Sequence, residues 1–133
     1  MRRGEVRFVD FEPVRGDLTE EPPPDGVGSS DMRRAEANKT RPAVIVSNDG
    51  ANATADRLGR GVVTVLPLTS NTERVYAFQV LLRAEDTGLP RDSKVQAEQV
   101  RSIAVERIGR RVGAVPPRLM ADVDAALRLH LGL

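Results

Sequence analysis

Apolar and polar residues alternate along much of this chain with the two-residue period of β-strands. Residues 5–11 (EVRFVDF) alternate in this way, which is typical of a strand with one buried face. Runs of β-branched residues at 43–46 and 62–66 predict central strands. Further strands are predicted at 78–82, 94–97, 99–103 and 111–115.

Only the C-terminal part of the chain shows a long helical pattern. Pro116 and Pro117 suit the start of a helix, because the first turn does not use the N–H group that proline lacks. Apolar positions and one histidine then recur at spacings of three and four: Leu119, Val123, Ala126, Leu127 and His130. A short helix is also predicted at 52–58. Together these elements predict an α+β fold, mainly β, with a small, strongly bent antiparallel barrel and a C-terminal helix.

Composition narrows both the class of protein and the chemistry it can perform. The 133 residues are 40% hydrophobic and 29% charged, which fits a single globular domain over 1–133. Because no apolar run approaches roughly 18 residues and no apolar signal region follows Met1, we expect a cytoplasmic protein without membrane contact. The lack of cysteine excludes disulfides, thiolate metal sites and cysteine nucleophiles. With 3% aromatic residues, we do not expect a base-stacking platform like that of common single-strand RNA binders.

The net charge of +1 hides an uneven distribution of charge along the chain. Residues 17–31 hold five acidic residues and no basic one, together with three consecutive prolines. We expect this segment to be a mobile loop, because it cannot bury enough apolar surface to offset the entropy of ordering. Residues 101–118 hold five arginines against one glutamate. Two interpretations of this arginine-rich composition stay open, namely phosphate recognition and genome-wide codon bias.

Two pairs of acidic residues resemble the carboxylate pairs that hold magnesium in metal-dependent nucleases. Asp10 and Glu12 would share a face at the end of a strand, whereas Asp122 and Asp124 would lie far apart around a helix. Solvated surface acids are the commoner interpretation of such pairs. His130 is expected to pack on the last helix rather than to catalyse a reaction. We therefore expect neither a metal site nor a cofactor.

Two other positions combine polar side chains with predicted strand ends. Pro42 cannot donate to a β ladder, so we expect it at the first residue of a strand, with Arg41 at the mouth of that strand. Thr69 and Ser70 end the next β-rich segment. Spacing alone leaves two interpretations open. Arg41, Thr69 and Ser70 could form a shared active site. Alternatively their roles could be structural, with Arg41 in an ion pair with the acidic loop and Thr69 as a cap at the strand end.

Six short motifs follow one another at compatible spacings over nearly the whole chain. They are RGEV at 3–6, VDFEP at 9–13, EANKTRPAVIVSND at 36–49, VLPLTS at 65–70, DSK at 92–94 and EQVRSI at 98–103. In this order they resemble the MazF/PemK family of toxins from toxin–antitoxin pairs, and mycobacterial and actinobacterial members most closely. The resemblance runs from Arg3 to about Leu131.

The resemblance implies a homodimeric SH3-like barrel that cuts single-stranded RNA at a short sequence, without a metal ion. Family members leave a 2′,3′-cyclic phosphate and a 5′-hydroxyl. The family's catalytic arginine and its catalytic threonine or serine correspond to Arg41 and Thr69. The substrate-binding residues expected on this basis are Ser70, Gln99, Glu36, Lys39 and Asn48. The resemblance also implies a cognate antitoxin that silences the toxin through a disordered acidic C-terminal segment, and contact with DNA only indirectly, through that antitoxin.

The chain departs from the family pattern by an insertion at about 17–35. It precedes Glu36, in the loop that lies over the active site in the family. An inert disordered loop is one interpretation. A tethered acidic mimic that partly shields the basic groove is the other, and RNA cleavage by a variant lacking 17–35 distinguishes the two.

Two alternative functions fit the same family of folds. One is a gyrase-poisoning toxin of the CcdB type, although such toxins act through an aromatic C-terminus and this chain ends LHLGL without tryptophan. The other is an inactive homologue that only binds an antitoxin, although Arg41 and Thr69 are both retained. RNA cleavage in the presence of a chelator separates these alternatives from an endoribonuclease.

Overall fold

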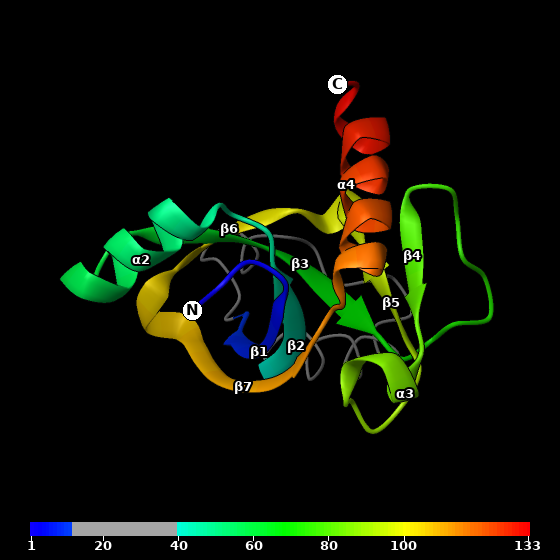
Figure 1. The fold of residues 1–133 in the computed structure, drawn as a ribbon, viewed down its shortest axis with the longest axis horizontal. Helices are drawn as coiled ribbons and strands as arrows, with labels where there is room; N and C mark the ends of the chain where they lie inside the picture. The colour runs from blue at the N-terminus through cyan, green and yellow to red at the C-terminus, as the bar shows by residue number, and fades with distance from the viewer. Residues whose placement is uncertain (12–39) are drawn as a thin grey trace, which may run out of the picture.

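The computed structural model of the chain describes residues 1–11 and 40–133. Glu12, the insertion at 17–35, Glu36 and Lys39 lie outside the described residues. Along the chain the elements are β1 (Glu5–Asp10), β2 (Thr40–Ile45), α2 (Asp49–Leu58), β3 (Val62–Thr69), β4 (Gln79–Leu82), α3 (Ala84–Thr87), β5 (Ser93–Gln96), η2 (Ala97–Gln99), β6 (Arg101–Ala104), η3 (Val105–Arg107), β7 (Ile108–Ala114) and α4 (Pro117–Leu131). The predicted α+β, mainly β fold with a C-terminal helix is confirmed (Figure 1).

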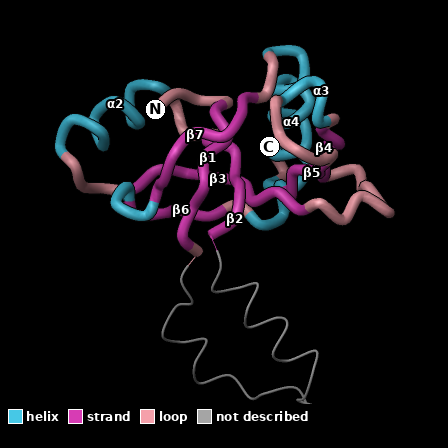
Figure 2. Tube along the Cα trace, turned by 90° about the horizontal axis from the view of Figure 1, so that it is seen from below, coloured by secondary structure: helices cyan, strands magenta, loops and turns pink. Residues whose placement is uncertain are grey.

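The seven described strands form one antiparallel sheet that is open. Its order is β4-β5-β3-β2-β1-β7, and β6 pairs with β3 beside this path. The small, strongly bent antiparallel barrel that the sequence predicted is a strongly curved sheet that does not close, as Figures 1 and 2 show. Two register shifts between β1 and β7 fit this curvature, because bulges bend and twist a strand pair.

Strand β3 changes its partner partway along its length. Val62 to Val65 pair with β6, whereas Leu68 and Thr69 pair with β5. Pro67, which has no N–H to donate to a ladder, lies between these two paired segments. This exchange carries the C-terminal end of β3 away from β6 and into the β4–β5 part of the sheet.

Alternation along β2 divides the core into two clusters. Val44 packs in the cluster that α4 covers, together with Leu66 and Leu68. Ala43 and Ile45 pack in the other cluster, which includes Ala55 of α2. Because successive side chains of a strand point to opposite faces, β2 is buried on both sides, as its unbroken apolar run requires.

Helix α4 begins with Pro117 and ends before Gly132, whose φ of 74° suits a left-handed C-cap. It buries Met120, Val123 and Ala126. The expectation that His130 packs on this apolar stripe is wrong, because the last turn extends past the sheet and leaves His130 exposed. Within the described residues, no helix is long and apolar enough to cross a membrane.

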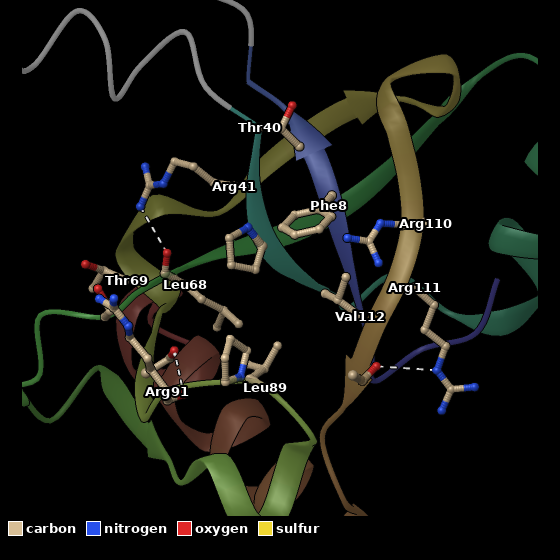
Figure 3. Close-up of a pocket in the computed structure, with 15 residues that line it drawn as sticks. Phe8, Thr40, Arg41, Leu68, Thr69, Leu89, Arg91, Arg110, Arg111 and Val112 are labelled. Carbon is tan, nitrogen blue, oxygen red and sulfur yellow. Dashed lines mark hydrogen bonds between the residues drawn. The ribbon is translucent and has the colours of Figure 1, made fainter.

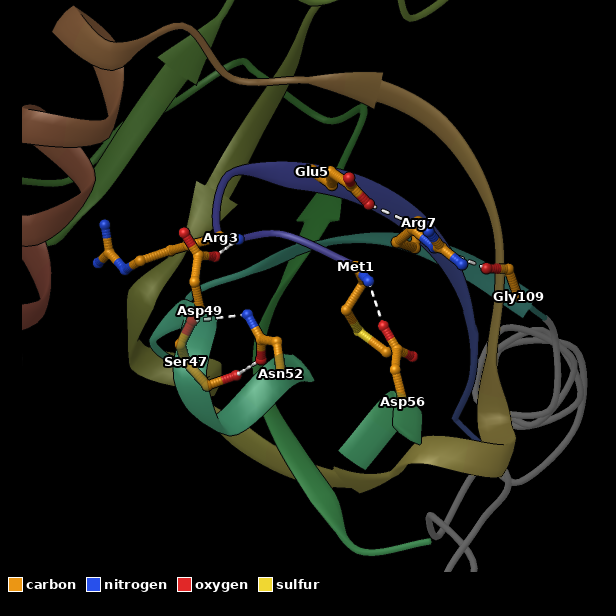
Figure 4. Close-up of polar contacts among 9 residues, drawn as sticks. All are labelled: Met1, Arg3, Glu5, Arg7, Ser47, Asp49, Asn52, Asp56 and Gly109. Atoms are coloured by element: carbon orange, nitrogen blue, oxygen red, sulfur yellow. Dashed lines mark hydrogen bonds and ion pairs between the residues drawn. The ribbon is translucent and has the colours of Figure 1, made fainter. Parts of the chain in front are cut away.

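The N-terminus is fastened beside α2 by polar contacts (Figure 4). Its amino group pairs with Asp56, and the Arg3 N–H donates to Asp49. Beneath them Asn52 is fully buried, and its side-chain amide donates to the Ser47 backbone oxygen over 2.9 Å.

Several observed elements differ from the local predictions. Pro42 is the third residue of β2 rather than the first, since the pairing of β1 with β2 extends back to Thr40. The strand predicted at 99–103 begins at Arg101, and Gln99 ends the short helix η2. The single turn α3 was not predicted, because its four residues are too few to show a helical period.

Candidate functional site

A pocket of about 820 Å³ opens where β1, β2, β3 and β7 meet the loop after α3 (Figure 3). Its apolar wall consists of Phe8, Pro42, Leu68, Leu89, Pro90 and Val112. Its polar rim includes Thr40, Arg41, Thr69, Ser70, Arg91, Ser93, Arg110 and Arg111. Four arginines around an apolar wall suit a ligand that has anionic groups and flat apolar surfaces.

Arg41 is the second residue of β2 and lies opposite Val9 of β1. Its Nη2 donates to the backbone oxygen of Leu68 over 3.1 Å and to Gln96 Oε1 over 3.4 Å. Its Cζ lies 6.0 Å from the centroid of the buried Phe11 ring. These contacts hold the guanidinium beside the pocket and leave further N–H groups for a ligand, because a guanidinium has five donors.

Thr69 is the last residue of β3, where it pairs with Lys94 of β5. Its half-buried hydroxyl accepts a hydrogen bond from the Asn71 N–H over 3.2 Å. A hydroxyl that accepts one bond still carries its own proton, so Thr69 can donate to a ligand in the pocket. Ser70 follows it, exposed, on the same pocket wall.

Of the residues that the sequence suggested, the pocket collects Arg41, Thr69 and Ser70. Asn48 lies elsewhere, as the N-cap of α2, where its Oδ1 accepts from the Ala51 N–H over 2.8 Å. Gln99 is exposed at the end of η2 and does not line the pocket. Gln96, three residues earlier, is the glutamine that contacts Arg41.

Three arginines of the pocket were not singled out from the sequence. Arg110 places its Cζ 4.9 Å from the centroid of Phe8. In Figure 3 Arg91 extends toward Thr69, whereas Arg111 turns away and donates to Gly113 O over 3.4 Å. The basic stretch 101–118 contains Arg110 and Arg111, so charge patterning was the signal that could have found them.

None of the described acidic residues lines this pocket. Asp122 is exposed on α4, and Asp124 pairs with Arg3. Within 1–11 and 40–133, no three His, Asp or Glu side chains come together in a way that could hold a metal ion.

Comparison with known proteins finds similar chains that are named as endoribonucleases or MazF toxins. The chain is 54% identical over 133 residues to "Endoribonuclease MazF9" of Mycobacterium tuberculosis, a match that covers all of this chain and 98% of that protein. The solved structure of an endoribonuclease in complex with its cognate antitoxin, from a mycobacterial species, superposes with a TM-score of 0.67 at 24% identity, covering 100% of this chain and 96% of the other. The structure of the Mycobacterium tuberculosis toxin MazF-mt6 superposes with a TM-score of 0.61 at 26% identity, covering 71% and 89%.

A family model agrees with these pairwise matches. The model for PemK-like, MazF-like toxins of type II toxin–antitoxin systems matches residues 2–131. That match spans almost the entire chain and includes Arg41 and Thr69. The chain therefore belongs to the PemK-like, MazF-like family of toxins of type II toxin–antitoxin systems.

Proposed function

We propose that this MazF-type endoribonuclease cuts single-stranded RNA at a specific sequence by using the 2′-hydroxyl of the substrate as the nucleophile, without a metal ion. The observation that carries the proposal is the position of the Arg41 guanidinium. It is bonded to the backbone oxygen of Leu68, the residue before Thr69, and both Arg41 and Thr69 line one pocket. Family membership and a relative named as an endoribonuclease support the same conclusion.

In the proposed reaction, O2′ attacks the adjacent phosphorus while the bond from phosphorus to O5′ breaks. The products are a 2′,3′-cyclic phosphate and a 5′-hydroxyl, so no water is consumed in this step. The proton of the 2′-hydroxyl must leave, and a proton must reach O5′. The chain needs to supply charge stabilisation and proton transfer only, which fits its lack of cysteine.

Arg41 and Thr69 would act on the non-bridging oxygens of the reacting phosphate. The guanidinium fork matches two phosphate oxygens, and a preorganised donor of this kind contributes about 3–4 kcal/mol to transition-state stabilisation. The Thr69 hydroxyl would add one further hydrogen bond. A guanidinium stays protonated at neutral pH and is a poor base. Two candidates for the base therefore remain, Glu36 and a water molecule held by Thr69.

The other arginines of the pocket would hold neighbouring parts of the RNA. Arg91 and Arg110 line the same pocket as Arg41, and each can bind a phosphate through paired N–H groups. The apolar wall formed by Pro42, Leu68 and Val112 would accept a base that is turned out of its stack.

The proposal extends to the partners of this toxin. We expect a homodimer in the cytoplasm that is silenced by the acidic, disordered segment of a cognate antitoxin and reaches DNA only through that antitoxin. A similar mycobacterial endoribonuclease, solved in complex with its cognate antitoxin, supports the antitoxin as partner. The arginine-lined pocket provides the complementary charge for an acidic segment.

Cleavage in a chelator tests the proposed reaction. The purified chain, incubated with a long RNA in EDTA, should produce fragments that carry a cyclic phosphate, and Arg41→Ala should abolish them. Arg60→Ala, which removes an exposed arginine after α2, should cut normally and controls for loss of charge. Cleavage only after addition of Mg²⁺ would refute the metal-free reaction, and no cleavage at all would favour a protein that only binds its partner.

A further inference from the structure

A second surface with features of a nucleotide site lies in the loop between β3 and β4. The rings of Tyr76 and Phe78 stack there, with centroids 5.4 Å apart and planes inclined by 4°. Tyr76 remains 45% exposed, so part of its ring is accessible to a ligand. In Figure 1 this loop stands at the edge of the molecule opposite α2.

Two cations surround the exposed ring. The Arg74 Cζ lies 5.8 Å from the Tyr76 centroid, and its Nη1 donates to the Tyr76 hydroxyl over 3.3 Å. The Lys94 Nζ also lies 5.8 Å from that centroid and donates to the backbone oxygen of Arg74. With Asn71 and Glu73 these residues line a hollow of about 580 Å³. The hollow thus offers an aromatic surface and two positive charges against one negative charge.

The loop is held in place by contacts with neighbouring strands. The Tyr76 N–H donates to Gln79 Oε1 over 3.1 Å, and Gln79 Nε2 donates to Glu98 Oε2 over 2.7 Å. Lys94 is only 8% exposed and belongs to β5, so its bond to Arg74 ties the loop to the sheet. A platform fixed in this way loses little entropy when a ligand binds.

Two residues of this hollow are direct neighbours of Thr69 in the proposed active site. Lys94 is the β5 residue that pairs with Thr69. Asn71, which lines the hollow, donates its N–H to the Thr69 hydroxyl over 3.2 Å. A strand of RNA that leaves the phosphate at Thr69 along this loop would therefore meet Tyr76 and Arg74 next.

We propose that the loop residues Arg74, Tyr76 and Phe78, with Lys94, form a subsite that binds a nucleotide flanking the cleaved phosphate. The base stacks on Tyr76, with Phe78 supporting the ring from beneath, and Arg74 binds the phosphate of that nucleotide. Single-stranded nucleic acid is the fitting occupant, because it combines flat bases with a regular series of anionic groups. The proposal rests on the RNA cleavage proposed above. It also revises the expectation from composition, since two aromatic rings are enough to form one stacking surface.

Intrinsic fluorescence provides a direct test, because Tyr76 is the single tyrosine and the chain has no tryptophan. The full chain is titrated with single-stranded 2′-O-methyl RNA, which has no free 2′-hydroxyl and cannot be cleaved. Stacking of a base should quench the tyrosine emission in a saturable way, and the affinity should fall as salt rises. A series of oligonucleotides with one abasic position each should lose the quenching at a single position.

The fluorescence experiment has clear contrary outcomes. Binding of a labelled oligonucleotide, followed by anisotropy, without any change in tyrosine emission would overturn the proposal. Quenching by a synthetic acidic peptide and not by the oligonucleotide would also overturn it and would assign the surface to a protein segment. Because the oligonucleotide is not cleaved, this test decides the subsite independently of whether the chain cuts RNA.

Substitutions test the same subsite through affinity and cleavage. Tyr76→Leu should weaken oligonucleotide binding about 10-fold or more, since stacking of one base contributes on this scale, whereas Tyr76→Phe should retain binding. Arg74→Ala should reduce the slope of log affinity against log salt concentration by about 1. The matched variant Arg60→Ala should leave this slope unchanged. Wild-type affinity in Tyr76→Leu would overturn the proposal. If Tyr76→Leu loses affinity and the wild type still fails to cut RNA in EDTA, the subsite stands and the cleavage proposal fails.

Discussion

The guanidinium of Arg41 donates to the backbone oxygen of Leu68 over 3.1 Å. This bond joins the beginning of β2 to the end of β3, two segments that are 27 residues apart in the chain. Because Leu68 directly precedes Thr69, the contact fixes the position of the guanidinium relative to the threonine hydroxyl. One acceptor that holds the Arg41 guanidinium is therefore a backbone atom, which a substitution of Leu68 leaves in place.

Replacement of Arg41 by lysine tests the geometry of the fork apart from its charge. Arg41→Lys should lower the cleavage rate about 100-fold, because the ammonium cannot give paired hydrogen bonds to a phosphate. RNA affinity should change by only a few fold, since the charge is kept. Single-turnover cleavage measures the rate and filter binding the affinity. Arg57→Lys, at an exposed position of α2, is the matched control. Full activity in Arg41→Lys would show that charge alone is sufficient.

Gln96 is expected to act by positioning Arg41. Gln96→Met removes the acceptor oxygen that lies 3.4 Å from Arg41 Nη2 and should lower kcat about 10-fold with little effect on KM. Gln96→Glu keeps an acceptor but adds negative charge near the phosphate, so it should raise KM and retain most of kcat. The split between kcat and KM in steady-state cleavage is the measurement. An equal decrease of kcat in Gln96→Met and Gln96→Glu would indicate that Gln96 has a purely structural role.

The buried Asn52 should contribute to stability rather than to catalysis. Its Oδ1 accepts from the Ser47 hydroxyl over 2.5 Å, and Nδ2 donates to the Ser47 backbone oxygen. Asn52→Ala leaves the hydroxyl and the backbone oxygen of the half-buried Ser47 without their partner and should lower the free energy of unfolding by about 2 kcal/mol. Urea unfolding at a fixed protein concentration measures the change. Thr54→Ala, an exposed position of the same helix, should have almost no effect. A loss of equal size in both variants would contradict the role of the Asn52 bonds.

Gly113 allows a close approach of β7 to α3. A Cβ atom at this position would lie 2.6 Å from the Thr87 backbone oxygen, which requires the backbone to move. Gly113→Ala should therefore destabilise the fold by about 1–3 kcal/mol. At Gly109 the nearest atom, the Phe8 oxygen, would be 3.1 Å away, so Gly109→Ala should cost less. Thermal unfolding of both variants measures which of them is the less stable. A larger decrease in stability for Gly109→Ala than for Gly113→Ala would contradict this prediction.

Much of the sheet could be predicted from local patterns, and its exceptions have local causes. The β-branched runs around Val44 and Val63 are central strands, because burial on both faces leaves a continuous apolar sequence. The segment 99–103 reads as one strand, yet its first residues complete the turn η2, and only Arg101 to Ala104 pair with β3. The partner exchange of β3 was not predictable, since the same alternation suits a strand with either neighbour.

The sequence motifs and the tertiary contacts identify different residues of the candidate site. The ordered motifs identify the family, and they pointed to Arg41 and Thr69 from residue type and order alone. Gln96, Arg91 and Phe8 carry no local signal, because their role arises only from what lies beside them across the sheet. The same holds for Tyr76 and Lys94, which come from a loop and a strand that meet only in the folded chain.

By itself the sequence determined most of the strand and helix pattern, the family and two residues that line the pocket, Arg41 and Thr69, because these depend on periodicity and on residue order. Only the tertiary structure decided that the sheet stays open, which arginines line the pocket and that two aromatic rings stack beside it. These features depend on strand register and on contacts between segments far apart in the chain. A one-dimensional pattern contains no distances between such segments, and it is those distances that place Arg41 beside Leu68 and Lys94 beside Tyr76.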